Sequence, residues 1–398
     1  MKIKNIYILL AAVVMITFPL FLGWLPLIGK IIPKMAILLY VLLFAPYLMK
    51  NRTFYCLLLF YLYIVFQSLV FGYGFDLITW FAVFMDFAVP IFLLHAAKKF
   101  DDNKTVKSLA LFSYIYIFVT VILSIIVMTN DPTALRQQQA MTVMEEYASA
   151  LQYNKQGLAS YAFAAMIMCM PAVLISVYKT TANARVRFLS IIGIVLCLVF
   201  MWMGQVTTTL LICICLAFIS IFLKNSSSKG IFIGAALLIL VVGLFGGSII
   251  DSVAPYTEGT AMETKFNNFS SRAHSGVDDT EEGSVQGRMA LTSLTLKVFS
   301  EHPIFGDPHG YIGGHNYYID RFALYGIIGV IPFFLMLYFF YKDAFRFLPP
   351  KKHSIYNLIF LGFIVLGILK NISGMEYWLF MFCFYPFILK YSTRFDGK

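Results

Sequence analysis

Long apolar runs constrain the fold of this chain more than any other feature. Residues 53–71, 188–204 and 354–370 are three such runs, and they contain almost no charge. About 20 consecutive apolar residues cross the hydrocarbon core of a bilayer as a helix, because a helix satisfies its own backbone hydrogen bonds there. Of the 398 residues, 13% are charged, against roughly 25% in soluble domains. The sequence therefore predicts an all-α polytopic integral membrane protein.

The apolar runs divide into twelve expected membrane helices, an even number that places both termini on the same side. They cover residues 6–24, 35–49, 53–71, 77–97, 108–128, 157–178, 188–204, 207–223, 231–250, 321–341, 354–370 and 376–390. The first run follows Lys2 and Lys4 and is similar to a signal peptide. No small-residue cleavage site follows it, so we expect it to be retained as a helix.

The charges predict which side of the membrane each connecting segment faces. If the N-terminus is cytoplasmic, the segments on that side hold 20 of the 30 lysines and arginines and only four acids. The segments on the other side hold the other 10 basic residues and 15 of the 20 acids. Cytoplasmic loops are enriched in Lys and Arg, so both termini are expected in the cytoplasm. The basic residues behind the net charge of +10 are thus explained by the orientation of the chain in the membrane. The net charge does not indicate a nucleic-acid partner.

The expected organisation has three parts. Residues 1–250 hold helices one to nine, residues 251–320 form a large external loop, and residues 321–398 hold helices ten to twelve. The loop has a polar, acidic middle, followed by apolar residues at helical spacing from residue 288 onward. This last stretch is too short and too polar to span a membrane. It predicts a helix at the outer surface that ends before Pro303.

Ionisable side chains are scarce inside the apolar runs, and this argues against a transporter. Asp86 is the clearest case, and two interpretations stay open for it: a paired residue near the kink before Pro90, or a functional site. A proton-coupled transporter usually carries several such groups at mid-depth. All six cysteines lie within apolar runs, so we expect neither a disulfide framework nor a cysteine metal site.

The richer polar chemistry is expected on the outer side. Four of the six histidines fall in the external loop, and their spacing matches no recognised metal-binding motif. Basic residues also occur there against the positive-inside preference; they are Arg136, Lys155, Arg272, Arg288 and Arg321. Arginine donates paired hydrogen bonds to phosphate oxygens, which suits a lipid diphosphate. Salt bridges with the external acids are the alternative interpretation.

A combination of motifs follows within the loop. An arginine opens an amphipathic stretch, a His-Pro-x-x-Gly turn ends it, and a His-Asn pair begins a helix that carries Gly-x-x-Gly. These residues are Arg288, His302, Pro303, Gly306, His315, Asn316, Gly326 and Gly329. Together they resemble the signature loop of the O-antigen polymerase and O-antigen ligase superfamily. Two glycines in this spacing also allow a helix to pack closely.

Other positions agree with this resemblance or depart from it. The segment Tyr153–Phe163 looks like the family's start of a middle helix, and Arg136 is placed like another external arginine of the family. Threonines at 207–209 stand where many members have serine and arginine. Gly313 and Gly314 stand where ligases often show a second histidine, which favours the polymerase branch.

The resemblance implies a multi-pass glycosyltransferase of the GT-C type in a bacterial inner membrane. Such an enzyme transfers a glycan from polyprenyl (undecaprenyl) diphosphate to a sugar hydroxyl of another lipid-linked repeat, and so builds O-antigen lipopolysaccharide or capsule. The activated donor removes the need for a metal or other cofactor. Besides the donor, the acceptor and membrane lipids, a chain-length regulator and a flippase of the same pathway are implied as partners.

The chemistry needs cations for the leaving diphosphate and a base for the acceptor hydroxyl. We expect His315 and Arg288 to be catalytic. The expected substrate-binding residues are Arg136, Lys155, Asn316, Tyr317, Tyr318, Asp320, Arg321, His302 and His309. For Asn316 and the tyrosines, a helix cap with an aromatic belt is the alternative interpretation. The alternative functions are a ligase with a different acceptor, or a flippase or transporter of lipid-linked oligosaccharides.

Overall fold

The computed structural model describes residues 5–24, 27–72, 76–143, 147–223, 285–309, 316–372 and 374–392, which form helices and connecting turns with no strand among them. The helices are α1 (Asn5–Thr17), α2 (Pro19–Trp24), α3 (Leu27–Phe44), η1 (Pro46–Met49), α4 (Arg52–Val70), α5 (Leu77–Lys99), α6 (Asn103–Asn130), α7 (Ala134–Val143), α8 (Tyr147–Lys155), α9 (Tyr161–Met166), η2 (Ile167–Cys169), α10 (Met170–Thr180), α11 (Ala184–Met203), α12 (Thr207–Phe222), α15 (Val285–Glu301), α16 (Tyr317–Phe347), η4 (Pro350–Lys352), α17 (His353–Leu369), α18 (Met375–Leu379), η5 (Phe380–Phe384) and α19 (Tyr385–Ser392). The all-α prediction is confirmed for these residues.

Seven of the described helical segments are long and apolar enough to cross a membrane. They cover Arg52–Val70, Leu77–Lys99, Asn103–Asn130, Tyr161–Thr180, Ala184–Met203, Tyr317–Phe347 and Pro350–Leu369. Shorter apolar helices cover Ile6–Thr17, Ile31–Phe44 and Thr208–Phe222. Many large apolar side chains face outward, including Leu69, which is 75% exposed. An apolar outer surface on a helical bundle is what lipid contact requires, so the chain is a multi-pass membrane protein.

Several helix boundaries differ from the expected ones. The run at residues 6–24 is divided between α1 and α2 just before Pro19, which has no N–H to continue the first helix. The expected span at 376–390 contains a wider π turn, Phe380–Phe384. The expected span at 231–250 lies outside the described residues.

The start of α3 is a clear departure from the sequence expectation. Lys34 was expected in an external connection, but α3 begins at Leu27 and includes it. The Nζ of Lys34 lies 2.7 Å from Oδ1 of Asp86 on α5 and also donates to the carbonyl of Ala82 at 3.0 Å. Both side chains are largely buried, at 9% and 19% exposure. The interpretation of Asp86 as a paired residue of the bundle is therefore confirmed.

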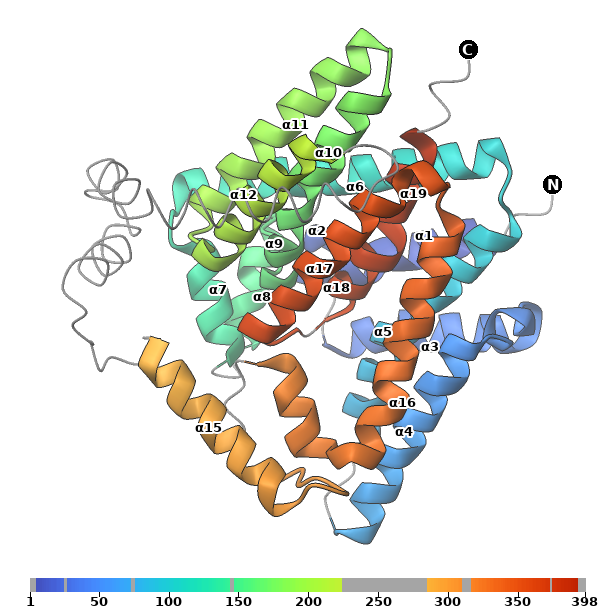
Figure 1. Ribbon diagram of the computed structural model, residues 1–398, viewed down its shortest axis with the longest axis vertical. Coiled ribbons are helices and arrows are strands. Elements are labelled where there is room, and N and C mark those ends of the chain that lie inside the picture. The colour runs from blue at the N-terminus through green and yellow to red at the C-terminus, as the bar shows by residue number, and fades with distance from the viewer. Residues whose placement is uncertain are drawn as a thin grey trace.

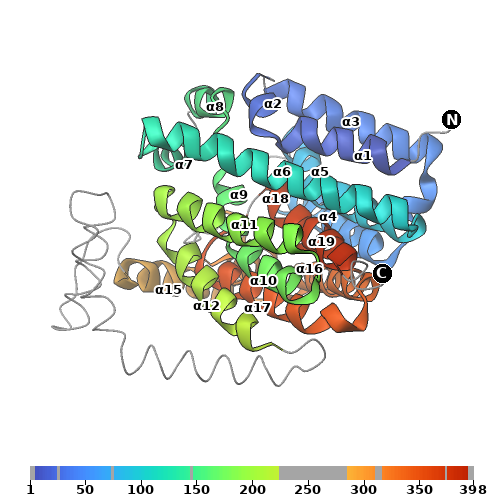
Figure 2. The ribbon, with the colours of Figure 1, turned by 90° about the horizontal axis from the view of Figure 1, so that it is seen from above.

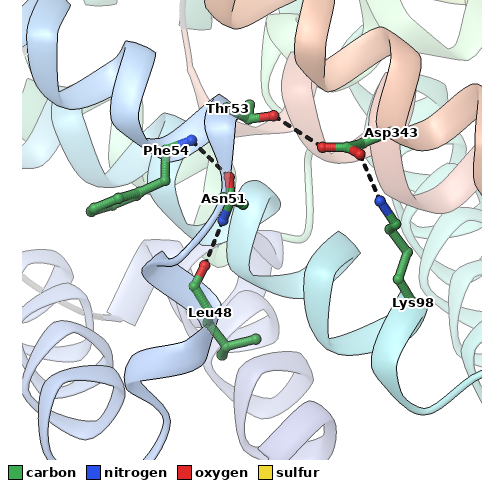
Figure 3. A network of polar contacts seen from close by, with 6 residues as sticks. All are labelled: Leu48, Asn51, Thr53, Phe54, Lys98 and Asp343. Atoms are coloured by element: carbon green, nitrogen blue, oxygen red, sulfur yellow. Dashed lines mark hydrogen bonds and ion pairs between the residues drawn. The ribbon is translucent and has the colours of Figure 1, made fainter.

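The two ends of the bundle differ in what they carry (Figures 1 and 2). The beginning of α1 and the end of α19 lie at one end, and α7, α8 and α15 lie at the other (Figure 1). We call these the basic end and the α15 end. At the basic end, Asp343 of α16 accepts hydrogen bonds from Lys98 of α5 at 2.6 Å and Thr53 of α4 at 3.1 Å (Figure 3). Asn51 caps α4 beside them by accepting from the N–H of Phe54, so this network fixes three helices to one another.

Candidate functional site

Helix α16 is broken near the α15 end, where Gly326 adopts φ 58° and ψ −174°. The turn that follows α15 packs against this break. The N–H groups of Ile327 and Ile328 donate to the carbonyls of Pro303 and Ile304, and the N–H of Asp307 donates to the carbonyl of Ala323. The turn thus supplies the backbone partners that one turn of helix has lost, as a break within a membrane segment requires.

Only glycine fits on either side of this contact. Gly306 also has a positive φ, of 72°. A Cβ at Gly306 would lie 2.4 Å from the nitrogen of Gly326, and a Cβ at Gly326 would lie 2.4 Å from the carbonyl oxygen of Ile304. Such separations are sterically forbidden, so the His-Pro-x-x-Gly turn and the first glycine of Gly-x-x-Gly form one backbone-to-backbone joint.

Helix α4 completes this joint. The Nε2 of Gln67 donates to the carbonyls of Phe305 at 2.7 Å and Leu324 at 2.8 Å, and Gln67 is only 1% exposed. The hydroxyl of Tyr63 donates to the same Phe305 carbonyl at 2.6 Å. A Cβ at Gly329 would lie 2.2 Å from the Tyr63 ring. The expected close helix packing is therefore found at Gly329, against α4, whereas Gly326 meets the backbone of the turn after α15.

The joint sets the direction of the first part of α16, residues 317–325, which runs at a steep angle to the rest of the helix (Figure 1). Asn316 caps it by accepting from the N–H of Ile319 at 3.2 Å, which confirms the cap interpretation for this residue. Helix α15 packs alongside. Thr295 donates to Asp320 at 3.3 Å, and the rings of Phe299 and Phe322 lie 5.6 Å apart.

These two contacts show that α15 and the first part of α16 run in parallel. Arg288 precedes Thr295 by seven residues, or about 10 Å at 1.5 Å per residue. Its backbone is therefore carried beyond the first turn of α16. The side chain of Arg288 lies outside the described residues, and so does all of His315. At the level of the backbone, α15 carries the predicted arginine past the start of α16.

Arg321 is the cation that this arrangement places within the bundle. Its guanidinium carbon lies 4.5 Å from the ring centre of Tyr317 and 5.6 Å from that of Tyr325, and its Nη1 donates to the Tyr325 hydroxyl at 3.1 Å. The side chain is partly buried. Among the described residues, no carboxylate lies within ion-pair distance of it. A cation held, among the described residues, by aromatic faces and a hydroxyl favours an anionic ligand.

Polar atoms without a hydrogen bond to any described residue lie on the helices that carry this site. They are the hydroxyls of Tyr61 and Tyr318 and the Oδ2 of Asp320. Tyr61 belongs to α4, where the neighbouring Phe60 meets the Tyr325 ring edge-on at 5.2 Å. Buried polar atoms are usually satisfied by protein, water or ligand. These groups therefore leave hydrogen-bonding capacity on α4 and on the first part of α16 for water or a polar ligand.

The two predicted tyrosines of α16 lie in the packed interior. Tyr317 is 1% exposed and lies 6.3 Å from the Trp378 ring, and Tyr318 is 8% exposed and covers Gly367 of α17. The carboxylate of Asp320 is directed to α15, as its bond with Thr295 shows. Tyr317 supports the position of Arg321 through its ring, and little of the surface of these residues is available to line a sugar site.

The remaining predicted residues are spread over the α15 end. His302 and His309 are exposed on the turn after α15. Arg136 is partly buried on α7, which packs on α8 and α9. Lys155 lies at the end of α8 with its Nζ 5.5 Å from the Trp24 ring of α2. Figure 2 shows α2 and α8 on one flank of the bundle and α15, which packs on α16, on the other.

The α8 segment near Lys155 is held by its own contacts. Tyr153 donates a hydrogen bond to Oε1 of Gln137 on α7. Partial burial, and then the negative charge of Asp131, raise the pKa of Tyr153 above its ordinary value. The raised pKa extends to higher pH the range over which the hydroxyl is protonated and donates. This contact ties α8 to α7, while Gly23 of α2 packs against the backbone of Asn154 and Lys155.

A second polar cluster at the α15 end was not anticipated as a site. It consists of Ser160 and Tyr161 at the start of α9, Lys370 after α17, and Glu376 in α18. Ser160 donates to Oε1 of Glu376 at 2.9 Å, and Lys370 donates to the Tyr161 hydroxyl. In the sequence, Lys370 and Glu376 bracket a short connection between two apolar runs. That juxtaposition is the signal that could have identified them.

No protein-family model matches this chain, and no curated protein matches its sequence. The chemistry of its own residues therefore carries the functional argument. That chemistry consists of a cation placed by a broken helix and a buried carboxylate with polar neighbours, both at the same end of a membrane-embedded bundle. The first group suits an anion and the second suits hydroxyl groups.

Proposed function

We propose that this protein is a polysaccharide polymerase that acts on lipid-linked sugar repeats at the outer face of a bacterial inner membrane. It transfers a glycan from polyprenyl diphosphate to a sugar hydroxyl of a second lipid-linked repeat. The acceptor oxygen bonds to the anomeric carbon while the bond from that carbon to the diphosphate breaks. The diphosphate leaves with the bonding electrons, and the hydroxyl proton passes to a base.

The observation that carries this proposal is the environment of Arg321. A guanidinium within the bundle, without a carboxylate partner among the described residues, supplies the preorganised positive charge that a leaving diphosphate needs. Its place on a helix of a membrane protein suits a diphosphate that is itself attached to a lipid. Arg288, whose backbone α15 carries past the start of the same helix, is proposed as a second diphosphate ligand, with Arg136 as a more distant one.

The proposed topology has twelve spans, both termini in the cytoplasm and the α15 end outside. It is supported by the common end shared by the beginning of α1 and the end of α19 (Figure 1). It is further supported by Lys98 and Lys390, which sit in ion pairs at that end, as expected for the cytoplasmic side. His315, one residue before the α16 cap, is proposed as the base that receives the acceptor proton.

The test uses purified protein in lipid nanodiscs supplied with a polyprenyl-diphosphate-linked repeat, with products separated on a gel. The wild-type chain is expected to give a ladder of polymers. Arg321→Lys keeps the charge but loses the planar fork, and we expect turnover to fall by about 10²–10³-fold. Arg52→Lys is the matched control, because Arg52 also lies over an aromatic ring, that of Phe339 at 5.9 Å, but at the basic end.

Other outcomes would assign the protein differently. Net movement of the lipid-linked sugar across the membrane without a ladder would indicate a flippase. Transfer only when a different acceptor is supplied would indicate a ligase. A full ladder from Arg321→Lys, at equal protein level, would show that this arginine does not hold the diphosphate.

A further inference from the structure

A hollow at the basic end lies between the ends of α10 and α12 and the start of α17. The polar residues that line it are Ser176, Lys179, Ser220, Lys351 and Ser354. Lys351 belongs to η4, which follows the end of α16, where the ring of Phe347 contacts Lys390 of α19. The hollow measures about 280 Å³ with its open mouth included, whereas sites that enclose a drug-sized ligand measure roughly 300–1,000 Å³. It therefore suits one small group rather than a whole substrate.

The lining combines positive charge with hydroxyl groups. Lys179 and Lys351 are exposed, whereas the three serines are buried. Among the described residues, no carboxylate lies within ion-pair distance of either lysine. Lys352 is fully buried and donates to the hydroxyl of Ser176 at 3.0 Å, which brings a third ammonium next to the lining. Ammonium groups and hydroxyls are side chains that bind phosphate, so the hollow suits an anion.

The start of α17 adds hydrogen-bond donors to this hollow. Helix α17 is 17 residues long, and no side chain caps its start. Ser354 is its second residue, and backbone N–H groups in the first turn of a helix have no partner within the helix. The hydroxyl of Ser354 makes no hydrogen bond to a described residue, although the residue is 7% exposed and lines the hollow. A helix start and a buried hydroxyl of this kind both favour a bound phosphate.

The two lysines of the lining differ in their other contacts. The Nζ of Lys179 donates to carbonyls at the end of α12, at 3.0 Å to Ser220 and 3.3 Å to Leu223. The ammonium offsets the partial negative charge of that helix end, which would otherwise repel an anion. Lys351 makes no hydrogen bond or ion pair to a described residue. Lys351 and Ser354 are therefore the residues that test the hollow as a binding site without disturbing a contact of the fold.

The hollow lies where a membrane helix reaches the lipid headgroups. Lys179 is the last residue but one of the span Tyr161–Thr180, and Lys351 is the second residue of the span Pro350–Leu369. Beside the lining residues in sequence, Tyr178 is 40% exposed and Ile221 is 53% exposed, as is typical of a surface in contact with lipid. Basic pockets between membrane helices bind the headgroups of anionic lipids.

We infer that this hollow binds a phosphate group through Lys351, Lys179 and the hydroxyl of Ser354. A phospholipid headgroup supplies such a group from the bilayer, and free phosphate supplies it from the water. The site lies at the basic end, away from Arg321, and it does not depend on the proposed polymerase activity.

The test uses the purified full-length protein in a neutral detergent, with bound lipid counted by native mass spectrometry. The probe is dioctanoyl phosphatidic acid, and dioctanoylglycerol, which has the same chains and no phosphate, is titrated in parallel. We expect the wild-type chain to bind phosphatidic acid at least about 10-fold more tightly. A repeat titration in ammonium phosphate, against ammonium acetate at equal ionic strength, identifies the source of the ligand. Competition indicates a site that also takes free phosphate, and its absence indicates a site specific for the lipid.

Three variants assign the binding to the hollow. Lys351→Gln should weaken the binding of phosphatidic acid on the order of 10-fold. Ser354→Ala should weaken it by about 3- to 10-fold and leave stability unchanged, because its hydroxyl has no hydrogen bond to a described residue. Lys104→Gln is the matched control and should leave binding unchanged. Lys104 is also exposed in the first turn of a membrane helix, α6, and that helix begins beside the ion pair of Asp101 with Lys390.

Unchanged binding in both Lys351→Gln and Ser354→Ala would overturn the site, and so would an equal loss in Lys104→Gln. Equal affinity of the wild-type chain for dioctanoylglycerol would also overturn it, because the acyl chains alone would then explain the binding. Failure of the wild-type chain to bind phosphatidic acid would do the same, whatever the polymerase assay shows.

Discussion

Replacing Gln67 by leucine tests whether the joint at Gly326 depends on α4. The amide of Gln67 is buried at 1% exposure and donates to the carbonyls of Phe305 and Leu324. In an unbroken helix, the N–H of Ile328 would serve Leu324. Here that N–H donates to Ile304 instead, so Leu324 depends on Gln67.

The expected loss in the free energy of unfolding follows from the hydrogen-bond donors that each carbonyl keeps. In Gln67→Leu the Leu324 carbonyl is left buried without its amide donor, at a cost of about 1–3 kcal/mol. The Phe305 carbonyl keeps its bond from Tyr63, so losing its second donor costs about 1 kcal/mol. We therefore expect the free energy of unfolding to fall by about 2–4 kcal/mol. Tyr63→Phe alone should cost only about 0.5–1.5 kcal/mol, because Gln67 still serves Phe305.

The double variant gives a sharper test. Once Gln67 is absent, removing the Tyr63 hydroxyl leaves Phe305 with neither donor. The second substitution should then cost about 1–3 kcal/mol. The loss of stability in the double variant should therefore exceed the sum of the losses in the two single variants. The measurement is reversible unfolding by SDS in mixed micelles, followed by tryptophan fluorescence.

Gln152→Leu is the matched control, since Gln152 is exposed on α8, and its effect should stay within about 0.5 kcal/mol. If Gln67→Leu costs no more than this control, or if the two substitutions are additive, α4 does not secure the joint. Because residues 317–325 carry Arg321, Gln67→Leu should also lower turnover by about 10²-fold through misplacement of the guanidinium.

Three further predictions use the same unfolding assay. Gly326→Ala should cost about 3 kcal/mol or more, since its backbone region is nearly glycine-only and a Cβ would lie 2.4 Å from a carbonyl oxygen; Gly72→Ala, with φ 70° and open space around it, is the control. Asp86→Asn should cost about 3–5 kcal/mol by leaving Lys34 buried without its carboxylate, and Lys34→Met combined with Asp86→Leu should recover most of that loss. Arg321→Met should abolish polymer formation while stability is unchanged or rises by about 0.5–2 kcal/mol; a marked loss of stability would indicate a structural role instead.

The sequence predicts the helical fold well because each signal lies within one segment. Apolar runs define α4, α5, α6 and α11 to within a few residues, since membrane helices are limited by length and composition rather than by partners. Helix caps are equally local, as Asn316 illustrates. The start of α3 is not set by a local sequence signal. The region around Pro33 and Lys34 is typical of a connection, but it is helical here, and its lysine pairs with Asp86 on another helix.

The candidate site shows the same limit. The glycines at 306 and 326 are visible in the sequence, and close packing is a reasonable inference from them. Nothing in the sequence shows that they face each other, because that pairing is made through backbone groups, which every residue has. Glu376 is a single acid near the end of an apolar run, and only the packing of α18 against α9 brings Ser160 to it.

Holding Arg321 in its place costs the protein folding stability, and the broken helix is part of that cost. A straight α16 would satisfy its own backbone groups and would need neither Gln67 nor two glycines with positive φ. The chain instead diverts three backbone hydrogen bonds to the turn after α15 and holds a cation within the bundle without a carboxylate among the described residues. Both features lower stability, and selection for folding alone would remove them. They are understandable if the bound state supplies what the protein withholds, namely an anion for the guanidinium and an acceptor for the buried Tyr61 hydroxyl. A lipid diphosphate supplies both at once.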